Sequence, residues 1–241
     1  AKEIYKGITK TGLAYSWYAS KEIYNILRKQ EKANEGVEFL KSSYRNINSP
    51  NIYEIYDYAR LLKNNEEFHE SIKYYTKVLN LIDKDHHLYP KATDGRGIAY
   101  ERTDQWKKAE EDFLDSLSIS PDQAHVINYL AYSWIEKGIN VEKSLKMLKK
   151  ANNLKQNDGY IVDSLGWALF KLKRYKESEK YLRLAIMLMP ADPIVNDHYG
   201  DVLWMTNEKI QARYYWNYAF NSEEADKKLK KSIKDKFIFG L

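Results

Sequence analysis

The chain has 241 residues, of which 44% are hydrophobic and 30% charged, so it can bury a continuous core beneath a charged surface. It has no cysteine, which excludes disulfides and thiolate chemistry, and no apolar run approaches the roughly 18 residues that a membrane span needs. The net charge of +5 is modest and comes largely from a lysine cluster near residue 230. The first residue is Ala1, so we expect a mature chain or a fragment.

Residues 1–50 carry a degenerate helical pattern. Residues 1–16 are predicted to form one helix, which Gly7 and Gly12 weaken because glycine is a poor helix former. A pair of helices is then predicted at residues 17–30 and 32–45.

From residue 51 a pattern repeats every 34 to 38 residues. Each repeat has a glycine or alanine on its first helix and a bulky residue on its second, and a small residue lets the two helices approach closely. Pro121 and Pro190 follow the ends of two second helices. The small residues are Ala59, Gly97, Ala131, Gly166 and Gly200, and the bulky ones are Tyr75, Phe113, Leu148, Leu182 and Trp216.

The motif Leu165-Gly166-x-x-Leu169 is matched, 34 residues later, by Tyr199-Gly200-x-x-Leu203. This spacing resembles the tetratricopeptide repeat (TPR) family. The resemblance implies an all-α, right-handed superhelix. We expect degenerate TPR-like helices in residues 1–50, about five TPR units in residues 51–222, and a C-terminal capping helix in residues 223–241.

The last predicted helix has an apolar stripe at Ala225, Leu229, Ile233 and Phe237, with lysines elsewhere. A solenoid needs such a polar-backed helix to cover its last apolar face. We interpret the lysines as a solvated outer face rather than a membrane or nucleic-acid patch.

The first helices of TPR units line the concave side, so the resemblance implies a candidate binding face there. Its aspartates and Asn128 can accept backbone N–H groups of an extended peptide or pair with its Lys and Arg, while the aromatic residues offer apolar pockets. In the alternative interpretation, the polar residues cross-link neighbouring first helices and the aromatic residues are half-buried. The candidate residues are Tyr56, Arg60, Asp94, Ile98, Asn128, Tyr132, Asp163, Trp167, Phe170, Asp197, Asp201 and Trp204.

The sequence therefore predicts a non-catalytic scaffold or adaptor that binds a protein or an extended peptide, with a basic or amphipathic partner segment favoured. The alternative is a substrate-recruiting region of a larger enzyme or protease complex. The acidic face argues against nucleic acid, and no direct membrane insertion is expected. No cofactor motif is present, and His86-His87 lies in an inserted loop whose geometry does not favour a metal.

The string YIVDSLGWALF is similar to the C-terminal arrays of bacterial TPR adaptors, some of them envelope lipoproteins. This resemblance favours the periplasm or cell envelope over the cytoplasm. It leaves the partner and the oligomeric state open.

Overall fold

The computed structural model describes Tyr5 and residues 16–241. In this part of the chain the regular structure is α-helical throughout and contains no strand, which confirms the predicted all-α fold. The chain forms two compact units, Ala1–Ile119 and Ser120–Leu241. The helix predicted over residues 1–16 lies outside the described residues, apart from Tyr5 and Ser16.

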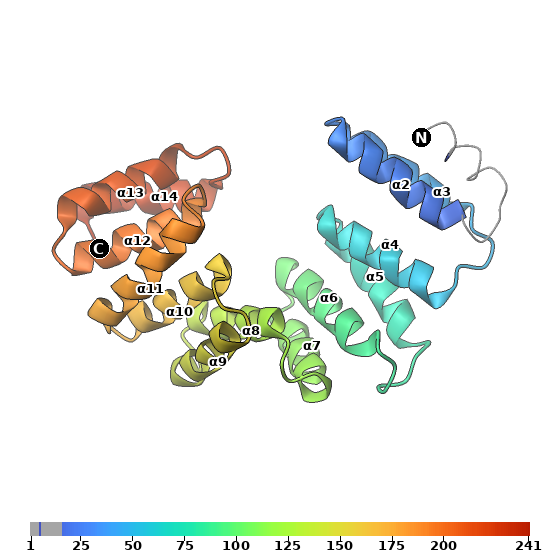
Figure 1. The fold of residues 1–241 in the computed structure, drawn as a ribbon, viewed down its shortest axis with the longest axis horizontal. Helices are drawn as coiled ribbons and strands as arrows, with labels where there is room; N and C mark the ends of the chain where they lie inside the picture. The colour runs from blue at the N-terminus through green and yellow to red at the C-terminus, as the bar shows by residue number, and fades with distance from the viewer. Residues whose placement is uncertain (1–4, 6–15) are drawn as a thin grey trace. The chain divides into compact units, whose positions relative to one another are not determined.

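The first unit consists of helix pairs in which each second helix runs back along the first (Figure 1). The pairs are α2 with α3, α4 with α5, and α6 with α7, and α5 also packs on α6. The helices are α2 (Ser16–Lys29), α3 (Ala33–Arg45), α4 (Ile52–Asn64), α5 (Phe68–Leu79), α6 (Tyr89–Arg102) and α7 (Trp106–Ile119).

The second unit repeats the same arrangement and adds a single helix, α14, which packs on α13 (Figure 1). Its first helices α8, α10 and α12 also contact one another in that order. The helices are α8 (Ala124–Glu136), α9 (Val141–Leu154), α10 (Gly159–Lys171), α11 (Tyr175–Leu188), α12 (Pro193–Met205), α13 (Lys209–Asn221) and α14 (Lys227–Phe239).

Local signals in the sequence set the helix boundaries. The side chains of Asn51, Asp158, Asp192 and Asp226 accept hydrogen bonds from backbone N–H groups of the first turns of α4, α10, α12 and α14. The turns inside five helix pairs each place one residue in the left-handed region, where it ends the first helix and redirects the chain. These residues are Glu31, Glu66, Asp104, Lys173 and Asn207.

The helices of a pair pack closely where the sequence predicted it. A Cβ atom on Gly97 would lie 2.9 Å from Cε1 of Phe113, and one on Gly166 would lie 2.7 Å from Cγ of Leu182. Such distances leave no room for a side chain. A hydrogen bond ties the same pair together, because Ser178 Oγ donates to the carbonyl oxygen of Gly166 at 2.8 Å.

No described helix is both long enough and apolar enough to cross a membrane.

Candidate functional site

Half of the candidate residues in the second unit are buried. The exposed fraction is 5% for Asp163, 7% for Trp167, 7% for Asp197 and 2% for Asp201. A carboxylate at this depth needs a charged or hydrogen-bonding partner. Each of the three aspartates has one, and in each case the partner comes from another helix.

Asp163 on α10 pairs with His198 on α12. The Nδ1 atom of His198 lies 3.1 Å and 3.0 Å from the two carboxylate oxygens of Asp163. Burial opposes a charged imidazolium, but the negative charge of Asp163 outweighs this effect and raises the pKa of His198 above its ordinary value. The pair therefore links two successive first helices through a buried, charge-assisted contact.

Trp167 is held in the same cluster. Its indole stacks on the His198 ring with centroids 3.9 Å apart and on the Phe170 ring at 4.8 Å. Its Nε1 donates to Oε1 of Glu136 on α8 at 2.6 Å. Trp167 was expected to offer an apolar pocket or to be half-buried, but the neighbouring first helices enclose it and leave it 7% exposed.

Asp197 and Asp201 on α12 share one lysine of α14. Lys236 Nζ donates to both carboxylates, at 2.7 Å to Oδ1 of Asp197 and 2.6 Å to Oδ1 of Asp201. Trp216 Nε1 adds a bond of 2.8 Å to Oδ1 of Asp201. Desolvation, followed by the charge of Asp197, raises the pKa of Asp201 to about 6, although Lys236 acts in the opposite direction.

The burial of Lys236 contradicts the prediction that all lysines of the C-terminal cluster lie on a solvated outer face. This lysine is 8% exposed and faces the core of the unit, whereas Lys227, Lys228, Lys231 and Lys234 are exposed as expected. Neither His198 nor Lys236 was selected from the sequence. They are separated from their partners by 35 to 39 residues, and only the packing of α10 on α12 and of α14 against α12 brings them together.

Other candidate residues remain partly accessible. Tyr132, Phe170 and Trp204 are half-buried, and cations lie over Trp204, with Lys209 Nζ 4.2 Å from its ring centroid. Asn128, on the same face of α8 as Tyr132, has a buried Oδ1 without a hydrogen-bond partner in the described part of the chain. This amide oxygen therefore lacks the hydrogen bonds that it can accept.

The electrostatic potential around Tyr132 is negative. Burial raises the pKa of its phenol, and the carboxylates of Glu136, Asp163 and Asp197 raise it further. A positively charged group beside this ring would be stabilised.

The first unit has a different inner face. Arg60 on α4 is exposed and lies 3.4 Å from Asp57, while Tyr56 and Asp94 are half-buried and Ile98 is 9% exposed. Burial lowers the pKa of the neighbouring Lys63 ammonium, with Asp94 acting in the opposite direction. The face is therefore a mixture of charges around an aromatic residue.

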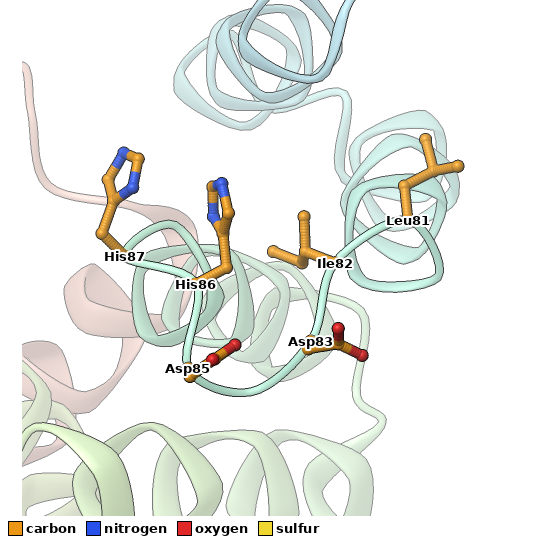
Figure 2. Close-up of a pocket in the computed structure, with 6 residues that line it drawn as sticks. All are labelled: Leu81, Ile82, Asp83, Asp85, His86 and His87. Carbon is orange, nitrogen blue, oxygen red and sulfur yellow. The ribbon is translucent and has the colours of Figure 1, made fainter.

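The loop between α5 and α6 forms an open hollow lined by residues Leu81, Ile82, Asp83, Asp85, His86 and His87. Figure 2 shows that the two imidazoles project to one side of the loop, so they do not converge with the carboxylates of Asp83 and Asp85. His86 Nδ1 accepts a hydrogen bond of 3.1 Å from the backbone N–H of Leu88. Among the described residues, no group of three or more potential ligands is placed to hold a metal ion.

Comparisons with known proteins agree on one family. A tetratricopeptide repeat model matches residues 55–85 and 163–192. A TPR repeat-containing protein of Pseudomonas aeruginosa is 27% identical over 150 residues, which cover 59% of this chain and 23% of that protein. The matched region thus spans less than a quarter of the relative's length.

Solved structures show the same fold. A tetratricopeptide repeat protein from Parabacteroides merdae matches with a TM-score of 0.72 and 16% identity, covering 97% of this chain and 90% of that chain. YrrB, a TPR protein described as having an unusual peptide-binding site, matches with a TM-score of 0.55 and 18% identity, covering 77% of this chain and 92% of that one. At these identities the likeness establishes the fold alone.

Proposed function

Because this chain is a tetratricopeptide repeat protein, we propose that it is a non-catalytic scaffold that binds a protein or an extended peptide along the inner faces of its first helices. TPR repeats generally mediate protein–protein interaction. The peptide-binding site described for YrrB is a precedent within the fold.

The observation that carries the proposal is the pair Asn128 and Tyr132 on α8. The Oδ1 atom of Asn128 is shielded from water and lacks a donor within the described residues, which is a costly state for a polar atom. The Asn128 side chain as a whole is half-buried, so a change of its rotamer on binding would bring this oxygen to a backbone N–H of an extended peptide. The half-buried Tyr132 ring, one turn further on, would pack against an apolar side chain of the same peptide.

The surrounding charges favour a basic or amphipathic partner in the second unit. Carboxylates of Glu136, Asp163 and Asp197 act on the Tyr132 phenol, and of these three Glu136 is exposed and would face a Lys or Arg of the partner. In this proposal Phe170 and Trp204 extend the contact surface. Asp163, Asp197 and Asp201 hold the first helices in place instead of touching the partner, and Trp167 supports them from beneath.

In the first unit, the proposed contact residues are Tyr56 and Arg60, with Asp94 on the next first helix. Ile98, on the same helix as Asp94, is buried and supports this face by packing. Arg60 and Asp94 carry opposite charges, so this part of the face suits a partner segment that also mixes the two signs.

The test compares capture of partner proteins by the wild type and by an Asn128→Ala/Tyr132→Ala variant. Proteins from a bacterial extract would be identified by mass spectrometry, and the affinity of the enriched partner would then be measured by titration calorimetry. We expect the double variant to bind at least tenfold more weakly, since it loses one hydrogen bond and one aromatic contact.

Tyr214→Ala is the matched control, because this tyrosine is 66% exposed and lies on a second helix. It should bind as the wild type does. Equal affinity of the wild type and the Asn128→Ala/Tyr132→Ala variant, with unchanged helicity, would remove the inner face of α8 from the proposal.

A second candidate function is to recruit substrates, as a region of a larger enzyme or of a protease complex. The relative from Pseudomonas aeruginosa is more than four times as long as the region it shares with this chain, since that region is 23% of it. A catalytic domain encoded in the same gene as this chain would favour this function.

A further inference from the structure

The outward face of α14 carries a row of exposed cations. Six of its thirteen residues are lysine and one is aspartate. Lys227, Lys231, Lys234 and Ile238 follow the spacing i, i+4, i+7 and i+11, so they lie along one face of the helix. All four are exposed, and the row is about 16 Å long at 1.5 Å per residue.

The opposite face of α14 is fixed against the rest of the unit. Ile233 is fully buried, in a cluster with Trp216 and Ala219, and Lys236 is held by Asp197 and Asp201. The helix therefore cannot rotate to hide its lysines. Exposure of these lysines therefore needs no conformational change.

Large apolar side chains extend the cationic row at its C-terminal end. The exposed fraction is 63% for Ile238, 81% for Phe239 and 52% for Leu241. Arg213 of α13 adds a further cation beside them, since its Nη1 donates to the carbonyl oxygen of Phe237 at 3.1 Å. Exposed apolar groups of this size next to cations usually mark a contact surface.

The exposed apolar residues beside the lysines argue against a merely solvated face, which is how the sequence pattern was interpreted. We propose that this face of α14 binds the surface of a bilayer rich in anionic lipid. The lysines pair with headgroup phosphates, while Ile238 and Phe239 enter the boundary between headgroups and acyl chains. The combination selects a bilayer over a nucleic acid, because a phosphate backbone offers no apolar layer to these side chains. The contact is peripheral, and α14 stays packed on α13.

The experiment is flotation of the 241-residue chain with vesicles of phosphatidylcholine alone or with about one-third phosphatidylglycerol. We expect binding to the anionic vesicles and none to the neutral ones. Binding should fall steeply between about 0.1 M and about 1 M salt, where the Debye length drops from about 10 Å to about 3 Å. A wild-type chain that does not float with anionic vesicles, or floats equally with neutral ones, overturns the proposal.

Charge-removing substitutions distinguish binding through this face from binding through the overall positive charge of the chain. Lys227→Gln/Lys231→Gln/Lys234→Gln should weaken partitioning about 100-fold, from roughly fivefold for each lysine. The control Lys146→Gln/Lys149→Gln/Lys180→Gln removes the same charge from exposed positions on α9 and α11 and should change binding little. An equal loss in both triple variants would refute a specific role of α14.

The apolar end is tested by Ile238→Ser/Phe239→Ser. Both side chains are largely exposed, so the fold should be unaffected. We expect binding to weaken at least tenfold while its salt dependence remains. Unchanged binding would overturn the assignment of these residues to the bilayer.

Discussion

At the scale of single residues, the buried charges of the second unit do not balance. Asp163, Asp197 and Asp201 face one imidazole, His198, and one ammonium, Lys236. Even with His198 protonated, one negative charge is left over. Desolvation is the main reason why the pKa of Asp201 is raised to about 6, and the excess negative charge from Asp197 adds to it.

The direction of the pH dependence follows from these shifts. A carboxyl group whose pKa rises from 3.8 to about 6 on folding stabilises the folded chain below the lower value, and this contribution is lost as the pH rises through about 6. His198 has the same sign, because its raised pKa stabilises the folded chain below 6.5 and the effect is lost at higher pH. Both groups make the second unit less stable as the pH rises.

We therefore predict that Asp201→Asn gains stability relative to the wild type as the pH rises from 4.5 to 7. The asparagine keeps an acceptor for Trp216 but carries no charge at either pH. Between these two pH values, the difference in the free energy of unfolding between Asp201→Asn and the wild type should change by on the order of 1–3 kcal/mol. Urea unfolding followed by tryptophan fluorescence at both pH values measures it, and a difference that does not vary with pH would contradict the prediction.

At the scale of elements, α14 is attached to α12 through one lysine and to α13 through apolar contacts. Lys236 bonds Asp197 and Asp201, while Ile233 packs near Trp216 and Ala219. The helix thus closes the unit with a buried ion pair as well as with the apolar face that the sequence predicted.

Lys236→Met should destabilise the second unit by about 3–5 kcal/mol, because it leaves two carboxylates buried without their cation. Lys234→Met, on the exposed face of the same helix, is the control and should change the free energy of unfolding by less than about 0.5 kcal/mol. Adding Asp197→Asn and Asp201→Asn to Lys236→Met should recover most of the loss. If it does not, the lysine acts mainly through packing and not through charge.

At the scale of the whole molecule, the contacts are between helices that are near neighbours along the chain. Stability in such an array is the sum of local units and their interfaces. Damage in one unit should therefore remain largely within that unit.

Gly200→Ala tests this locality. The added Cβ would lie 2.6 Å from Nε1 of Trp216 and 3.1 Å from the carbonyl oxygen of Ala212, so α12 and α13 must move apart. Overpacking of this kind costs about 1–3 kcal/mol. Hydrogen exchange read by mass spectrometry should show lost protection in α12 to α14 and unchanged protection in α4 to α7. Equal loss in both regions would show that the chain unfolds as one cooperative unit.

The sequence by itself determined the repeat, because each helix pair needs a small residue opposite a bulky one, as Gly166 and Leu182 or Gly97 and Phe113 show. The two residues of such a contact are about 16 positions apart in the chain, so a search for repeated patterns can detect the pair. The helix starts at Asp158 and Asp192 are equally local. The predicted row of residues on the first helices also follows from helical spacing alone.

Only the tertiary structure decided which of those residues remain accessible. Asp163 meets His198, and Asp197 meets Lys236, across contacts between successive first helices and the closing helix. Whether a carboxylate on such a face meets solvent or a neighbouring helix depends on how closely the helices stack. Side-chain volumes along the whole unit set that distance, so no short motif encodes it.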